Sequence, residues 1–304
     1  MNAIVDTTTE QTFEVSAPCI ASSAVYADLS ISVWTGIKLD KAATRQTLTA
    51  NGADSEMGNF RKKLLGDCAE LTAVQKYAAN TRNWHYGSSM PWGMMGQRLL
   101  PTTILPDYIY QITEHEREFG RLVNDFLGVY EWAQTSAQAK LSGLWNADDY
   151  PTVESLRTKF KFYHAQIKIP EDSTDWRLKV GADTQQYLKE QYRKHYAEQL
   201  HNAMGDVWQR TYDALAKMSE KLDYKSSEDK DTRKIFRDSL VGNVHDMLGL
   251  LVKFNITGDA KMEAMRIQLE DAMTGVSADA LREDDVFRLD TKKKIDAIRS
   301  SMTW

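Results

Sequence analysis

Cysteine, proline and long apolar runs are all scarce in this chain of 304 residues. Two cysteines, Cys19 and Cys68, share no metal-ligand spacing, which indicates a reducing cytoplasm rather than a disulfide-built secreted domain. No apolar stretch approaches the roughly 18 residues of a membrane span, and the first residues lack the basic and apolar regions of a signal peptide. The sequence therefore predicts a cytoplasmic protein with no membrane contact.

An excess of charge of one sign is also missing. The chain holds 38 basic and 43 acidic residues, which give a formal net charge of −5. No overall basic field draws the molecule onto nucleic acid, so any such binding must be local.

Catalytic signatures are absent from the sequence as well. We find no glycine-rich phosphate loop, nucleophile elbow or dinucleotide fingerprint. His195 and His201 are six residues apart, on different helix faces, while His115 lies on an apolar stripe and is expected to be a hydrogen-bonded core residue. The neighbours Asp148 and Asp149 are expected in a turn and define no two-carboxylate site. The sequence thus predicts no enzyme, no metal and no cofactor.

Two long amphipathic patterns dominate what is present. The first runs from Tyr108 to Leu144, with apolar residues at alternating steps of three and four, and predicts a helix of about 50 to 60 Å. The second predicts a similar helix, and its stripe comprises Leu188, Tyr192, Tyr196, Leu200, Met204, Val207, Thr211, Leu215, Met218 and Leu222.

A lysine-rich segment with strand periodicity lies between these helices. Apolar and basic residues alternate from Lys159 to Ile169, with a phase shift after Tyr163 that is typical of a β-bulge. A polar loop and a second alternating run from Trp176 to Val180 follow, so we expect a β-hairpin.

The fold class predicted from these patterns is mainly α with a few β-strands (α+β). We expect a long antiparallel helical hairpin, with a β-hairpin between its helices, and a C-terminal helical section. The expected segments are a disordered tail (1–24), an N-terminal α+β section (25–106), the long helical hairpin with its inserted β-hairpin (107–225) and the C-terminal helical section (226–304). Within the second segment we expect a helix from Phe60 to about Asn83, an aromatic loop from Thr81 to Gly96, and an edge strand or extended connector near 99–105.

The β-hairpin is the first candidate nucleic-acid site. A two-stranded ribbon with a basic face can follow a phosphate backbone or enter a groove. Lysines on an exposed strand also protect its edge from aggregation, which is their more common use. The residues concerned are Lys159, Lys161, Lys168, Arg177 and Lys179.

The expected aromatic loop is the second candidate site. Arg82, Trp84, Tyr86 and Trp92 form a composition suited to stacking single-stranded bases over a basic groove. The same residue types are enriched in protein interfaces, and they also pack beneath long loops. We rank ordinary packing first, protein contact second and nucleic acid third.

Three segments carry a resemblance to a known family. They are VWTGIKLDKAA (33–43), LWNADDYPTVESLRTKFKF (144–162) and FRDSLVGNVHDMLGLLVKFNITGD (236–259). Together they resemble an uncharacterised protein family of bacteriophages and conjugative mobile elements. Genes of that family often lie near those for a MoxR-type AAA+ ATPase and a von Willebrand A-type protein. The resemblance implies a bacterial cytoplasm, but the family has no assigned activity and supplies no functional residues.

The leading hypothesis is a non-enzymatic interaction or assembly protein of a bacteriophage or mobile element. It would self-associate or bind a protein partner, such as an AAA+ ATPase. The alternative is a nucleic-acid-binding protein that uses the basic β-hairpin and the aromatic loop.

Overall fold

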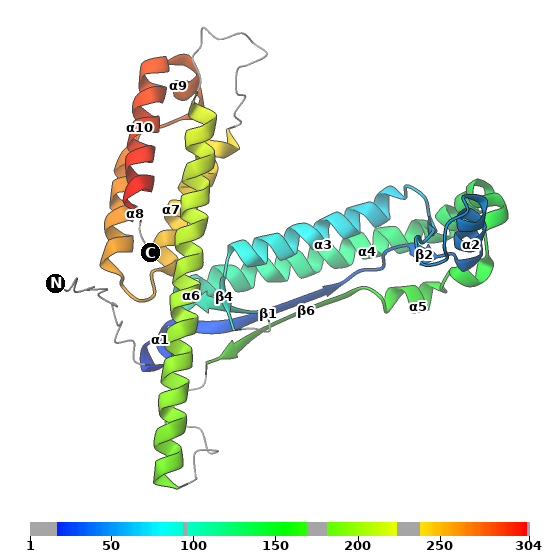
Figure 1. The fold of residues 1–304 in the computed structure, drawn as a ribbon, viewed down its shortest axis with the longest axis horizontal. Helices are drawn as coiled ribbons and strands as arrows, with labels where there is room; N and C mark the ends of the chain where they lie inside the picture. The colour runs from blue at the N-terminus through cyan, green and yellow to red at the C-terminus, as the bar shows by residue number, and fades with distance from the viewer. Residues whose placement is uncertain (1–16, 94–95, 170–180, 224–237, 303–304) are drawn as a thin grey trace, which may run out of the picture. The chain divides into compact units, whose positions relative to one another are not determined.

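The computed structural model describes residues 17–93, 96–169, 181–223 and 238–302 (Figure 1). Helices predominate and the strands are few, so the predicted fold class is confirmed. The chain forms two compact units: unit 1 comprises residues 1–27, 88–105 and 166–304, and unit 2 comprises residues 28–87 and 106–165. Each unit combines segments that are distant in sequence, unlike the consecutive sections that the sequence suggested.

A four-stranded sheet has the order β4-β5-β1-β6. Its strands are β1 (Ala24–Ser32), β4 (Met90–Trp92), β5 (Gln97–Pro101) and β6 (Lys161–Lys168). β5 pairs antiparallel with both β4 and β1, and Leu99 lies opposite Met90 on one side and Tyr26 on the other. The expectation of an edge strand near 99–105 was wrong, because β5 is an inner strand whose Leu99 and Leu100 are fully buried. β1 and β6 each continue from one unit into the other.

The core of unit 2 forms along α3 (Ala69–Gly87) and α4 (Leu105–Leu141), which lie side by side (Figure 1). The apolar stripe predicted for α4 is buried as expected. Phe126 is fully buried, and its ring lies 6.2 Å from that of Trp34 and 5.7 Å from that of Phe160. After α4 the chain forms two short 3₁₀ turns and α5 (Val153–Arg157).

A second, two-stranded sheet pairs β2 (Ile37–Leu39) with β3 (Arg61–Lys63), and α2 (Lys41–Ala50) lies between these strands in the chain. The Asp40 carboxylate accepts hydrogen bonds from the backbone N–H groups of Ala42 and Ala43 and is the N-cap of α2. The helix expected from Phe60 begins only at Ala69. The residues before it form β3 and a turn in which Gly66 has a φ of +60°.

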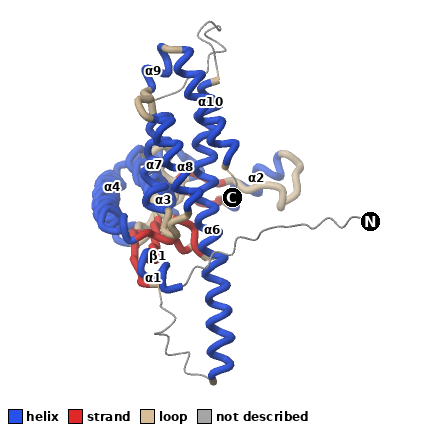
Figure 2. Tube along the Cα trace, turned by 90° about the vertical axis from the view of Figure 1, so that its left-hand side faces the viewer, coloured by secondary structure: helices blue, strands red, loops and turns tan. Residues whose placement is uncertain are grey.

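Unit 1 is built around α6 (Ala182–Leu222). Figure 2 shows α7 (Ser239–Phe254), α8 (Ala260–Met273) and α10 (Asp285–Ser301) near α6, which contacts mainly α7, α10 and β4 and, to a smaller extent, α1 (Ala17–Ser23). α8 packs against α7 and α10, and the short α9 (Ala278–Glu283) precedes α10. Side-chain caps start α8, α9 and α10 at Asp259, Ser277 and Asp284.

The two long helices belong to different units, α4 to unit 2 and α6 to unit 1. Each therefore packs with partners of its own unit, whereas the sequence suggested one helical hairpin. β6 forms the first strand of the expected β-hairpin and neighbours β1 in the sheet. The expected return strand, 176–180, lies outside the described residues. The expected tail of residues 1–24 includes the helix α1 (Ala17–Ser23) and the first residue of β1, while residues 1–16 are not described.

Candidate interaction surfaces

The aromatic residues predicted to form a loop lie mostly on a helix. α3 continues through Trp84 and Tyr86 to Gly87, because no proline or internal glycine interrupts residues 69–86. The Arg82 guanidinium donates to the carbonyl oxygen of Ile31 at 2.6 Å, and Trp84 stacks on Tyr108 at 5.0 Å between ring centroids. Tyr86 remains half exposed. The loop prediction was wrong, and ordinary packing accounts for Arg82 and Trp84.

Trp92 is also a packing residue, but in unit 1. It lies on β4, only 3% exposed, with its ring between those of Tyr26 (6.3 Å) and Tyr196 (6.1 Å). α6 closes over this strand, since the N–H of Gly93 donates to the side-chain carbonyl of Gln199 at 2.9 Å. The predicted platform for stacking bases is therefore not formed by Trp84 and Trp92.

Two tyrosine–histidine pairs stabilise the interior of unit 2. The Tyr77 hydroxyl lies 2.8 Å from Nδ1 of His115, and the Tyr108 hydroxyl lies 2.7 Å from Nδ1 of His85. Trp84 lies between the pairs, 4.6 Å from the His115 ring. Burial lowers the pKa of His115 and raises the pKa of Tyr108, so both side chains are neutral near pH 7. His115 is the hydrogen-bonded core histidine that the sequence predicted.

Three of the five basic residues of the predicted hairpin site are among the described residues, two in unit 2 and one in unit 1. Lys159 and Lys161 are exposed in unit 2, where Phe162 turns inward and its ring lies 5.5 Å from that of Phe119. Lys168 is exposed at the end of β6, in the part of that strand that belongs to unit 1. Arg177 and Lys179 lie outside the described residues. The described residues of this site in unit 2 are therefore an exposed pair, Lys159 shortly before β6 and Lys161 at its start.

A buried charge cluster in unit 2 was missed by the sequence analysis. Lys62 is only 6% exposed, and its Nζ lies 2.6 Å from Oδ2 of Asp149, 3.0 Å from Oδ2 of Asp40 and 2.7 Å from the carbonyl oxygen of Leu144. Lys38, opposite Lys62 in the β2–β3 sheet, lies 2.6 Å from Oδ1 of Asp149. One face of this sheet is thereby fixed to the turn that follows α4.

Opposing effects set the protonation of this cluster. Burial alone lowers the pKa of Lys62, but the carboxylates of Asp149 and Asp40 outweigh it and hold that pKa above its ordinary value. Burial raises the pKa of Asp149, and the ammonium groups of Lys38 and Lys62 outweigh that effect and hold it below its ordinary value. Hydrogen bonds from the Ala43 N–H and the Lys62 ammonium likewise hold the pKa of Asp40 below its ordinary value. Lys62, Asp40 and Asp149 are therefore charged at neutral pH, which suits an anchor rather than an acid–base catalyst.

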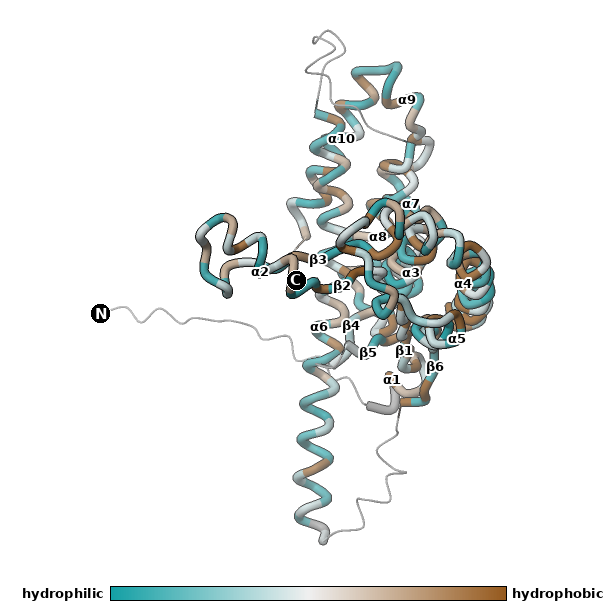
Figure 3. Tube along the Cα trace, turned by 90° about the vertical axis from the view of Figure 1, so that its right-hand side faces the viewer, coloured by the Kyte–Doolittle hydropathy of each residue, from teal (hydrophilic) through white to brown (hydrophobic). Residues whose placement is uncertain are grey.

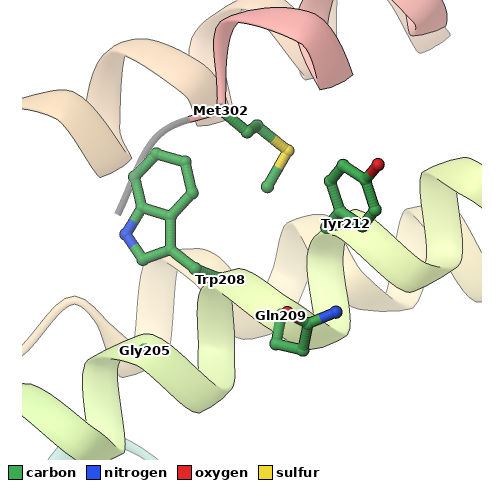
Figure 4. Close-up of a pocket in the computed structure, with 5 residues that line it drawn as sticks. All are labelled: Gly205, Trp208, Gln209, Tyr212 and Met302. Carbon is green, nitrogen blue, oxygen red and sulfur yellow. The ribbon is translucent and has the colours of Figure 1, made fainter.

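A small surface pocket of about 280 Å³ lies in unit 1 (Figure 4). Gly205, Trp208, Gln209 and Tyr212 of α6 line it together with Met302, which follows α10. In Figure 4 the thioether of Met302 lies between the rings of Trp208 and Tyr212. These five residues include no carboxylate, imidazole or amine, so the lining supplies no group for acid–base chemistry near pH 7.

The N-terminal part of α6 is an exposed helical surface of unit 1. We call residues 183–195 the α6 arm. No residue of the arm is buried, whereas every member of the predicted stripe from Leu200 to Leu222 is. Figures 1 and 2 show the arm continuing away from α7, α8 and α10, and Figure 3 colours most of it hydrophilic. Leu188 and Tyr192 continue the stripe into the arm, where Tyr192 is 38% exposed.

Comparisons with known families, curated proteins and solved structures find no match to this chain. In the described residues, no group of three or more histidine, cysteine, aspartate and glutamate side chains is placed to hold a metal ion. No helix of the described ranges is both long and apolar enough to cross a membrane.

Proposed function

We propose that this protein is a non-enzymatic assembly protein that self-associates through the α6 arm. The observation that carries the proposal is the change in burial along one helix stripe. The stripe is buried from Leu200 onwards, whereas Leu188 is only partly buried and Tyr192 is 38% exposed, although the residue types hardly change. A helical face of this kind normally packs on a partner.

Helix energetics support a partner for the arm. The arm is continuous with the rest of α6, a helix of 41 residues, and helices gain little stability in water from backbone propensity alone. Tertiary packing usually provides the missing stability, and the arm has no buried side chain to supply it. A second helix laid along Leu188 and Tyr192 would provide that packing.

The composition of the arm favours a second copy of this chain as the partner. Two acidic and three basic side chains are interspersed along it, so two arms approach with little net repulsion. Tyrosine is enriched in protein interfaces, and Tyr187 and Tyr192 are 61% and 38% exposed. An AAA+ ATPase, the partner class suggested by the family resemblance, would then bind the assembled form.

Substitutions on the arm test this proposal. We expect Leu188→Glu and Tyr192→Glu each to weaken dimerisation at least about tenfold, because each places a charge in an apolar contact. Gln186→Glu is the matched control, since it adds the same charge to an exposed site on the opposite side of the helix. The measurement is sedimentation velocity over a concentration series. Equal dimerisation of all four proteins would exclude the arm as the contact.

Nucleic-acid binding is the second candidate function, and the exposed pair Lys159 and Lys161 favours it. Neither lysine has an ion-pair partner in the described residues, and the exposed ring of Tyr163 follows on the same strand. We expect Lys159→Glu/Lys161→Glu to abolish salt-dependent retardation of single-stranded DNA or RNA in gels. Lys76→Glu/Lys140→Glu, which reverses two exposed lysines elsewhere in unit 2, is the control for charge alone. Retardation that survives in the first variant would eliminate this site.

A further inference from the structure

The β2–β3 sheet presents two different faces. Because directly opposite residues of antiparallel strands share a face, Lys38 and Lys62 lie on one face and Ile37, Leu39, Arg61 and Lys63 lie on the other. We call the second set the outer face. Its four side chains are all exposed, whereas Lys62 is buried against Asp40 and Asp149. The inner cations are thus paired with carboxylates inside the protein.

The outer cations lack comparable partners. Arg61 has no ion pair or hydrogen bond to its side chain in the described residues. Lys63 contacts only Asp67, at 3.3 Å, and the Asp67 side chain is 97% exposed. Since neighbours two apart on a strand lie roughly 6 to 7 Å from each other on the same face, Arg61 and Lys63 form a short cationic row.

The backbone edge of β3 is open at the same two residues. The N–H of Leu64 donates to the carbonyl of Gly36 at 2.7 Å, and the N–H of Asp40 donates to the carbonyl of Phe60 at 3.0 Å. Hydrogen-bonded pairs alternate along an antiparallel ladder, so the N–H and C=O groups of Arg61 and Lys63 point away from β2. No third strand pairs with this two-stranded sheet in the described residues.

We propose that the edge of β3 binds an acidic, extended segment of a partner protein as an added strand. A strand paired with this edge places its residues i and i+2 directly opposite Arg61 and Lys63 on the outer face. Carboxylates at those two positions would pair with Arg61, which has no ion pair in the described residues, and with Lys63, whose contact with Asp67 is exposed to solvent. The backbone pairing supplies hydrogen bonds. The chemical signature of the partner is therefore a strand with aspartate or glutamate at alternate positions.

Two further features favour this partner over an unoccupied edge. Lys62 fixes β3 from the inner face, so little ordering of β3 is needed on binding. Ile37 and Leu39, 47% and 41% exposed, add apolar area that a neighbouring chain can cover. Cations on an edge strand also discourage edge-to-edge aggregation and repel basic strands. An acidic strand is therefore the partner that this edge selects.

The probe for this proposal is a fluorescein-labelled peptide in which glutamates alternate with valines. We expect it to bind the full-length protein, measured by fluorescence anisotropy, and a peptide of the same composition with contiguous glutamates to bind at least about tenfold more weakly. N-methylation of the glutamate nitrogens should cause a similar loss, because those N–H groups would pair with β3.

Variants of the protein complete the test. Arg61→Glu/Lys63→Glu should weaken binding of the alternating peptide at least about tenfold. Lys76→Glu/Lys140→Glu changes the same charge at exposed sites of unit 2 and should leave binding within about twofold. No binding, equal loss in both variants, or equal binding of the N-methylated peptide would overturn the proposal. The peptide comparisons use the unaltered protein, so they hold even where a variant fails to fold.

Discussion

Replacing Lys62 with methionine is expected to lower the free energy of unfolding of unit 2 by about 3 to 5 kcal/mol. The substitution removes the ammonium group that lies 2.6 Å from Asp149 and 3.0 Å from Asp40. The Asp149 side chain is only 5% exposed, so its charge would stay buried with Lys38 as its remaining partner. The carbonyl of Leu144 would also lose its donor. Urea denaturation followed by tryptophan fluorescence measures the change.

Lys63→Met is the matched control for this experiment. Lys63 is the next residue of β3, its side chain is 67% exposed, and its substitution should change the free energy of unfolding by less than about 0.5 kcal/mol. A loss below about 1 kcal/mol in Lys62→Met, or equal losses in the two variants, would contradict the anchoring role of Lys62.

The difference between the unaltered protein and Lys62→Met should shrink in acid. Burial opposes ionisation of Asp149, and Lys38 and Lys62 overcome that effect, so the pKa of Asp149 lies below its ordinary value. A lowered carboxyl pKa contributes stability above the ordinary value near 4, and this contribution is lost as the pH falls through the folded-state pKa. In the variant, protonation of Asp149 relieves an uncompensated buried charge. Denaturation at pH 7 and near pH 3 gives the two differences to compare.

Replacing Phe126 with alanine is expected to cost about 3 to 5 kcal/mol of stability. The Phe126 side chain is fully buried, and its ring contacts those of Trp34, Tyr130 and Phe160 at centroid distances of 6.2, 5.9 and 5.7 Å. Removing the ring loses its transfer free energy and leaves a cavity lined by groups that relax only in part. The same denaturation measurement reports the loss.

Trp132 provides a control on the same helix. Its side chain is 74% exposed, so Trp132→Ala should change stability by about 0.5 kcal/mol or less. If both substitutions had the same effect, the core of unit 2 would not be centred on Phe126. If only Trp132→Ala were destabilising, α4 would bury the opposite face.

Long periodic segments were predictable from the sequence because their signal is summed over many residues. The stripe of α4 is buried around Phe126, and the stripe of α6 is buried from Leu200 onwards. Short segments could not be predicted in this way. The residues Arg61–Lys63 form a strand, although no apolar alternation marks them. The end of α3 was assigned to a loop because glycine and proline follow it closely.

The candidate sites depended on long-range contacts that no local pattern encodes. Asp149 was interpreted as a turn residue, and its partner Lys62 is far from it in sequence. Trp84 and Trp92 are close in sequence but belong to different units, since the boundary falls between Gly87 and Ser88. The exposure of the α6 arm was equally hidden, because Leu188 and Tyr192 follow the same periodicity as the buried stripe beyond Leu200.

The measurement that tests the central claim most directly is the mass of the unaltered protein by light scattering, over concentrations from low to high micromolar. Self-association through the α6 arm predicts a mass that rises from 34.6 kDa towards twice that value as concentration increases. A mass that stays at 34.6 kDa throughout would contradict the proposed self-association.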